Sequence, residues 1–165
     1  MGWFDKVKTA FGGHGVKVEA VSVERQPVDG DIVFPLTDSV IKGQFKITFS
    51  SSQEVLSHVT EFVLQRRHPD GREEPIVLGV DRHDAAHPVY GAQVAPPYTA
   101  RPGQVVESGF CITDVDIPNT LMKLGYLTPG LALADDDLSF YVRVTADVKG
   151  TILDADVKVP IEIAA

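Results

Sequence analysis

The regular alternation of apolar and polar residues near the end of the chain is the clearest pattern in the sequence. From Leu138 to Val148 every second residue is apolar. A period of two indicates a β-strand with one buried face and one solvated face. After Gly150 the alternation resumes from Val157 to Ile163, which predicts an antiparallel partner strand. Pro160 within that partner predicts an edge position or a bulge.

Three further segments predict strands nearer the start of the chain. Val16–Val23 holds two alternating valine pairs, which predicts a strand with an irregularity between the pairs. Phe45–Phe49 alternates strictly with polar residues. Val55–Arg67 alternates less strictly, so a helix is the alternative for Glu54–Gln65.

A turn and a long connection organise the middle of the chain. Pro69-Asp70-Gly71 predicts a turn, and the short strand expected at Ile76–Val80 would complete a hairpin with the segment before it. Between Asp81 and Gly103 the chain holds four prolines and two glycines, and so many residues that break secondary structure exclude a continuous helix or a central strand. We expect this region to be an irregular connection.

Two segments have helical character. Gly2–Phe11 has an aromatic and aliphatic face at helical spacing and ends at Gly12-Gly13, which predicts a short amphipathic helix. A helical turn at Leu121–Leu124 is also expected, with Asn119 and Thr120 as candidate caps. The apolar face of the first helix consists of Trp3, Phe4, Val7 and Phe11.

This aromatic face is the strongest candidate interaction site in the sequence, because a helix so short needs a surface on which to dock. Three interpretations compete. The favoured one is packing against its own domain. Docking onto another chain and reversible attachment to a membrane surface are the alternatives.

Together these patterns predict an all-β fold, an antiparallel two-sheet β-sandwich with a short N-terminal amphipathic helix. The sequence has 165 residues, a usual length for one domain, and shows no internal repeat. We assign residues 1–13 to the helix and residues 14–165 to a single β-sandwich domain.

The charge and the cysteine content narrow the function. Acidic residues outnumber basic ones by 23 to 15, for a net charge of −8, so nucleic acid is a poor partner. The single cysteine, Cys111, excludes an intrachain disulfide, and its apolar neighbours predict a buried, inert thiol. Nothing in this cysteine content points to an oxidising compartment, so a cytoplasmic location is expected. No apolar run reaches the roughly 20 residues of an integral membrane segment.

One cluster of residues is a candidate metal site. His83 and His87 lie four positions apart, and Asp81 is a candidate third ligand. The arrangement requires a helix, but Pro88 favours a loop, and the glutamate of a zinc-protease motif is missing. We therefore expect no cofactor, and keep a metal-binding module or metal-dependent enzyme as the alternative.

Other polar groups are more simply explained as structural. The aspartates at 114, 116 and 135–137 lack the glycine and glutamate of a calcium-binding loop, and a solvated loop before a strand accounts for the last three. No GxSxG nucleophile motif occurs, so no catalytic residue is assigned. A sandwich that binds a small ligand is a further alternative.

Both ends of the chain resemble a known family. The string from Gly2 to Gly13, followed by Val16-Lys17-Val18-Glu19, is similar to the start of the bacterial sporulation-control (Spo0M) proteins, which belong to the arrestin-like, immunoglobulin-like β-sandwiches. Arg143–Gly150 and Val159–Ile163 resemble the closing hairpin of an arrestin-like half. Because arrestin-like proteins generally contain two sandwiches, the resemblance implies that this chain is one such half.

The resemblance also implies a function. It points to a non-enzymatic adaptor or scaffold with unidentified protein partners and a link to sporulation or stress regulation, and homo-oligomerisation is an open alternative. The expected mechanism is β-strand addition at an exposed sheet edge, for which Val157–Ile163 is the candidate strand.

Overall fold

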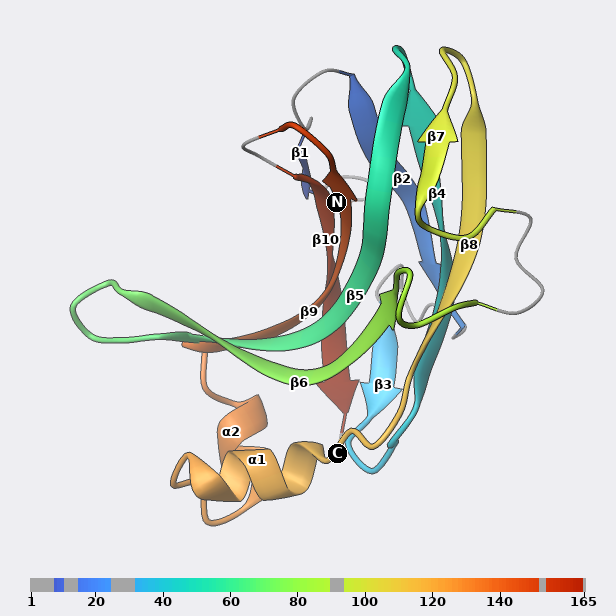
Figure 1. Ribbon diagram of the computed structural model, residues 1–165. Helices are drawn as coiled ribbons and strands as arrows, with labels where there is room; N and C mark the ends of the chain where they lie inside the picture. Colours follow the sequence, from blue (N-terminus) through green and yellow to red (C-terminus); the bar gives the residue numbers. More distant parts are fainter. Residues whose placement is uncertain (1–7, 11–14, 25–31, 90–93, 152–153, 165) are drawn as a thin grey trace.

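Two β-sheets make up most of the structure, a computed structural model that describes residues 8–10, 15–24, 32–89, 94–151 and 154–164. The larger sheet has the order β1 (Lys8–Ala10), β10 (Ala155–Ala164), β9 (Leu138–Val148), β5 (Gln53–Arg67) and β6 (Glu73–His83); in addition β3 (Val33–Pro35) pairs with β10 and β7 (Tyr98–Ala100) with β5. The smaller sheet has the order β2 (Val16–Val23), β4 (Ile41–Phe49) and β8 (Val105–Ile112). Two short helices, α1 (Ile117–Lys123) and α2 (Pro129–Leu133), lie together at one end (Figure 1).

The predicted hairpin at the end of the chain is confirmed. β9 and β10 pair antiparallel, with Val144 opposite Val157 and Val142 opposite Val159. The alternate residues of β9 from Phe140 onward are buried, as the period of two predicts. The apolar alternation is therefore the inner face of the larger sheet.

The prediction that Val157–Ile163 forms a free edge is wrong. The outer side of β10 is covered by β1, which pairs antiparallel with residues 156–158, and by β3, which pairs parallel with residues 162–164. Glu162 donates its N–H outward to the carbonyl of Ile32, so the missing N–H of Pro160, two residues earlier, also lies on the outer side. Pro160 thus falls between the two short covering strands and costs no ladder hydrogen bond.

β5 forms a strand throughout, so the helical alternative for Glu54–Gln65 is wrong. It lies between β9 and β6, and its pairing shifts register near Val55 and again between Phe62 and Val63. The first shift places an extra residue, Leu56, in β5 and interrupts its alternation, whereas the second places the extra residue, Leu78, in β6. Val63, on the face opposite to Phe62 and Leu64, is also buried, so three consecutive residues of β5 are buried. These irregularities explain why the sequence pattern resembled a helix.

Other local predictions hold in part. β2 shifts register between Glu19 and Ser22, as the valine pairs indicate. The 69–71 turn joins β5 to β6, with Gly71 at a φ of 85° that suits glycine. The connection expected from Asp81 is shorter than predicted, because β6 continues to His83 and β7 lies within the region.

The helical predictions need two corrections. α1 begins earlier than expected, and its N-cap is Asp116, whose carboxylate accepts the N–H of Asn119. At the start of the chain, Lys8–Ala10 form strand β1 and not part of a helix, because they pair with β10. Residues 1–7 and 11–13, which hold Trp3, Phe4, Val7 and Phe11, lie outside the described residues. In the part of the chain that is described, no helix is long and apolar enough to span a membrane.

One hydrophobic core joins both sheets to the helices. It includes Phe45 of β4, Ile112 of β8 and Val144 of β9, together with Ile117 and Leu121 of α1. All five are nearly inaccessible to solvent. The helices therefore close one end of the same core.

Close packing between neighbouring strands leads to a stability prediction at Gly43. A Cβ placed there would lie 2.1 Å from the Ser22 carbonyl oxygen, which the backbone holds in place. We expect Gly43→Ala to destabilise the fold by roughly 1–3 kcal/mol, measured by urea unfolding. The matched control is Gly109→Ala on the adjacent strand, where the nearest atom is 3.4 Å away and little change is expected. Equal stabilities for the two variants would contradict this packing.

Candidate functional site

The predicted metal cluster does not assemble. Asp81 and His83 lie on β6 and His87 lies in the turn that follows, so these residues share no helix. His83 Nε2 is 3.0 Å from Asp81 Oδ2, whereas His87 Nδ1 is 2.8 Å from Asp84 Oδ1. The two imidazoles therefore engage different carboxylates. Among the described residues no group of three or more His, Cys, Asp or Glu side chains is arranged to hold a metal.

A different polar cluster lies where β5 and β6 pair. His58 of β5 is directly opposite His83 of β6, so the two rings share one face of the sheet. His58 is only 1% exposed. Its Nε2 lies 2.9 Å from the hydroxyl of Tyr98, and its ring meets Phe45 edge-on at 5.3 Å. The Nδ1 atoms of both histidines are buried without a hydrogen-bond partner.

The environment of this cluster sets its protonation states. Burial, reinforced by the neighbouring charge of His83, lowers the pKa of His58 to about 4. Burial also raises the pKa of Tyr98 above its ordinary value. For Asp81, burial alone would raise the pKa, but hydrogen bonds from His83 and from the Cys111 N–H lower it overall. At neutral pH the cluster therefore combines a neutral His58 with an ionised Asp81.

Asp81 also links the two sheets. Its Oδ2 accepts a hydrogen bond of 2.8 Å from the backbone N–H of Cys111, which belongs to β8. One carboxylate thus engages His83 on its own strand and a main-chain donor on the facing sheet. Asp81 fastens the edge of the larger sheet to one end of β8.

Cys111 is exposed, so the prediction of a buried thiol is wrong. Phe110 and Ile112 on either side are buried, and the period of two in a strand directs the residue between them to the opposite face. The apolar neighbours of Cys111 in the sequence are buried themselves, but they do not indicate burial of Cys111.

The exposed thiol leads to a prediction on reactivity. We expect Cys111 to react with a chromogenic disulfide reagent in the folded protein at close to one thiol per chain, because it is the sole cysteine and faces solvent. Absorbance would give the stoichiometry with and without urea. A thiol that reacted only in urea would contradict the exposure of this face of β8.

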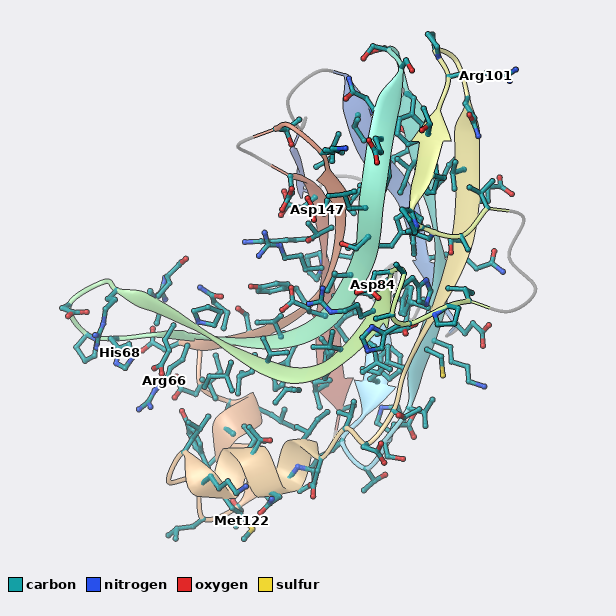
Figure 2. All side chains as sticks on the ribbon, in the orientation of Figure 1. Arg66, His68, Asp84, Arg101, Met122 and Asp147 are labelled. Atoms are coloured by element: carbon teal, nitrogen blue, oxygen red, sulfur yellow. The ribbon has the colours of Figure 1, made fainter. Side chains whose placement is uncertain are left out.

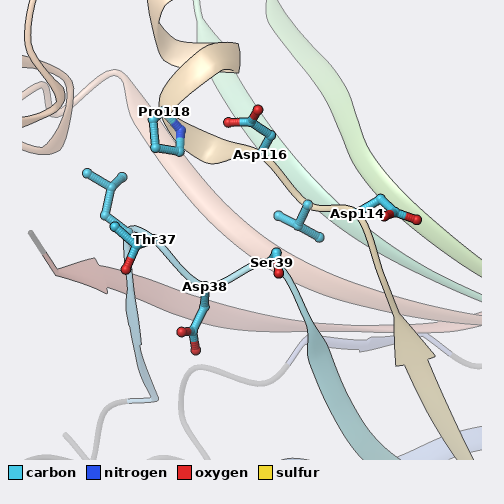
Figure 3. A pocket seen from close by; sticks show the side chains of 8 residues that line it. Thr37, Asp38, Ser39, Asp114, Asp116 and Pro118 are labelled. Atoms are coloured by element: carbon cyan, nitrogen blue, oxygen red, sulfur yellow. The ribbon is translucent and has the colours of Figure 1, made fainter.

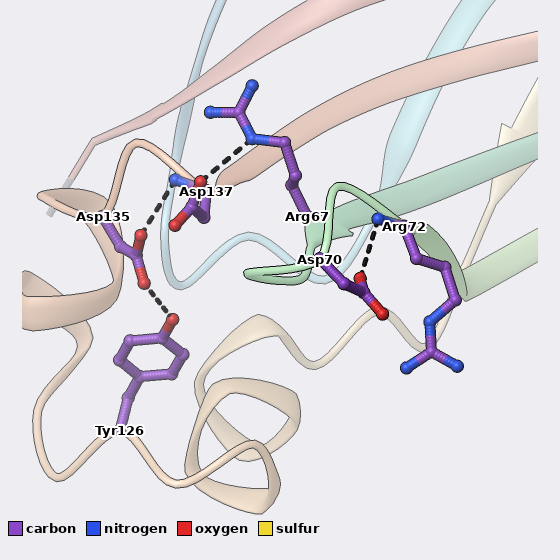
Figure 4. Close-up of polar contacts among 6 residues, drawn as sticks. All are labelled: Arg67, Asp70, Arg72, Tyr126, Asp135 and Asp137. Atoms are coloured by element: carbon purple, nitrogen blue, oxygen red, sulfur yellow. Dashed lines mark hydrogen bonds and ion pairs between the residues drawn. The ribbon is translucent and has the colours of Figure 1, made fainter.

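Three of the aspartates considered for calcium, Asp116, Asp135 and Asp137, have structural partners. Asp114 and Asp116 line a cavity of about 480 Å³ at the start of α1, together with Asp38 (Figure 3). Asp116 is engaged as the helix cap. Before β9, Asp135 accepts the hydroxyl of Tyr126 and Asp137 lies 3.0 Å from Arg67 Nε (Figure 4). The latter pairs fasten the loop before β9, as a solvated structural loop requires.

The strand edges differ in how well they are protected. β6 carries Pro75 and a bulge near Val77, two devices that blunt an edge. β2 carries its own register shift, and β10 is covered by β1 and β3. β8 pairs with β4 without any shift, and no described strand pairs with its other side. In the described part of the chain, β8 is therefore the regular edge, and the sequence analysis did not identify it.

The exposed side chains on this framework include both apolar and charged residues. Met122 projects from α1 and is 61% exposed, and Asp84 marks the turn after β6 (Figure 2). On β8 itself, Val105 is 48% exposed, and Glu107, Gly109 and Cys111 are also exposed. The solvent face of β8 is thus mixed in character.

Two sheets packed around one core define a β-sandwich. Among solved structures, the chain is similar to Spo0M, the sporulation control protein from Bacillus subtilis, with a TM-score of 0.60 and 15% sequence identity. The match covers 92% of this chain and 50% of the Spo0M chain, so this chain spans half the length of that protein. No protein-family model and no curated protein matches the sequence. The resemblance inferred from the two ends of the chain is confirmed at the level of the fold.

Proposed function

We propose that this chain is a non-enzymatic protein-binding domain that acts as an adaptor or scaffold. The observation that carries this proposal is the regular outer side of β8, which no described strand covers. An uncovered strand edge offers main-chain donors and acceptors to an extended segment of another protein. Strand addition is therefore the natural binding mode, with β8 in place of the covered β10.

The use of the ionisable groups supports binding in preference to catalysis. Asp81 joins two sheets, Asp116 caps a helix and Asp137 pairs with Arg67. His58 lies within the core and packs against aromatic rings. Each of these groups has a structural neighbour that accounts for its position, and this favours a domain whose polar side chains maintain the fold.

The setting of the function is proposed from the structural likeness. Spo0M is described as a sporulation control protein. We carry over from it only a regulatory role. The adaptor mechanism and a cytoplasmic location are proposed for this chain in its own right. Partner recognition is expected to depend on the surface of this one sandwich.

Affinity purification followed by reconstitution tests this function. The tagged full chain is expressed in its source cells, crosslinked and purified beside an unrelated acidic domain carrying the same tag. Each protein enriched over that control is then produced recombinantly and titrated against the full chain by calorimetry. We expect at least one to form a stoichiometric complex. Failure of every enriched protein to bind in purified form would count against the adaptor function.

A further inference from the structure

Along β8, the main-chain N–H and C=O groups of successive residues point alternately towards β4 and away from it. At one end, the carbonyl of Gln104 accepts a hydrogen bond from the N–H of Phe49, the last residue of β4, so this carbonyl points towards β4. At the other end, the N–H of Cys111 points away from β4 towards Asp81. Alternation between these positions directs the main-chain groups of Val105, Glu107 and Gly109 outward.

We propose that the outer edge of β8 over Val105–Gly109 accepts an extended segment of a partner protein as an additional antiparallel strand. This inference rests on the proposed protein-binding function and names its site. The sheet formed by β2, β4 and β8 is purely antiparallel, which favours addition in the same sense. No shift between β4 and β8 interrupts the edge.

The side chains on the solvent face of β8 specify what that segment carries. Glu107 is the charged residue of the edge and selects a lysine or arginine opposite it. Gly109 leaves space above the strand, because a Cβ there would have only the Gly43 carbonyl oxygen nearby, at 3.4 Å. An aromatic side chain opposite Gly109 would cover this position. Val105, 48% exposed, favours an apolar residue opposite it.

The added strand has a defined limit. The N–H of Cys111 is already bonded to Asp81, so pairing ends after Gly109. The segment therefore presents an aromatic, a basic and an apolar residue at alternate positions, read from its amino end, because antiparallel pairing reverses the order along β8.

The same contacts argue against a second copy of this chain as the occupant. Symmetric pairing of β8 with itself about Glu107 would place two glutamates directly opposite each other, which is unfavourable. If the symmetry axis moved to residue 108, Val105 would pair with Cys111 and need its N–H. If it moved to residue 106, Gly109 would pair with Gly103 and need the N–H of Gly103. These groups are bonded to Asp81 and to the Phe49 carbonyl, respectively. We therefore exclude symmetric β8–β8 pairing and assign the edge to a different protein.

A blocked synthetic peptide with the sequence Tyr-Thr-Lys-Thr-Val tests the site on the full chain. Amide hydrogen exchange by NMR is measured with increasing peptide. In the free protein we expect rapid exchange at Val105, Glu107 and Gly109 and protection at Val106 and Phe110, which face β4. Peptide should slow exchange at Val105, Glu107 and Gly109 only, because these three amides point away from β4. Protection that appears elsewhere, or nowhere, would overturn the proposed site.

Matched variants separate edge pairing from indirect effects. Gly109→Pro removes one outward N–H without removing a bond to β4, and we expect it to weaken peptide binding at least about tenfold. Gly109→Ala retains the N–H and should change binding by less than about threefold. Circular dichroism confirms that both variants fold.

A charge exchange provides a test that is read as a change of preference between two peptides. Because Lys46 of β4 lies opposite Glu107, circular dichroism first confirms that the variant folds. Glu107→Lys should weaken binding of the lysine peptide and strengthen binding of the same peptide with glutamate in place of lysine. Unchanged preferences would overturn the assignment of Glu107.

The natural partner distinguishes this inference from the function on which it rests. If a reconstituted partner binds Gly109→Pro and wild type equally well, the edge proposal fails while the protein-binding function stands. If no partner binds wild type, the function itself fails.

Discussion

Acidification from pH 6.5 to pH 4 is expected to cost the fold about 3 kcal/mol through His58 alone. The pKa of this imidazole falls from the ordinary 6.5 to about 4 on folding, because the ring is buried and His83 is nearby. Each unit of difference corresponds to about 1.36 kcal/mol. Between these two pH values the unfolded chain binds a proton that the folded protein does not, so stability falls as the pH falls.

The full contribution of His58 is therefore present above pH 6.5 and is lost progressively as the pH approaches 4. Urea unfolding at a series of pH values measures this dependence. The variant His58→Gln has no titrating ring, so its stability should fall less steeply in the same interval. It should also be less stable than wild type at neutral pH, because it loses the ring contacts with Phe45 and Tyr98.

His87→Gln is the matched control, because the side chain of His87 is 61% exposed and lies outside the cluster. We expect it to retain the wild-type dependence on pH. Equal slopes for wild type and His58→Gln would show that the buried imidazole does not determine acid sensitivity.

Phe62→Ala is expected to have the largest effect among single substitutions considered for the core, about 3–5 kcal/mol. Phe62 is fully buried in β5 and stacks on Phe140 of β9, with ring centroids 5.9 Å apart. β5 is central, since it pairs with both β6 and β9. Removing the ring leaves a cavity at the junction of three strands.

Chemical denaturation measures this loss, and Val80→Ala on the neighbouring β6 is the control. Val80 is 47% exposed, so its truncation should change stability by less than about 0.5 kcal/mol. A cost below about 1 kcal/mol for Phe62→Ala would contradict the close packing of β5 against β9.

Several elements of the fold could be predicted from local sequence because a strand with one buried face has to alternate. The alternation places β4, β9 and β10 where the structure has them, and the valine pairs of β2 predict its register shift. The same reasoning was insufficient for β5. An extra residue at Leu56 and the burial of Val63 on the second face give β5 consecutive buried residues, and periodicity alone does not distinguish such a run from a helix.

By itself, the sequence determined that the chain forms paired strands with alternating faces, and the residues at its two ends carried the likeness to an arrestin-like sandwich. Only the tertiary structure decided which edge is covered, because β1 and β3 reach β10 from the far end of the chain. It also decided the polar contacts. Asp81 meets Cys111 across 30 positions, and His58 meets Tyr98 across 40. The local alternation of apolar and polar residues indicates which face of a strand is buried. Contacts between strands that are distant in sequence depend on how the two sheets pack.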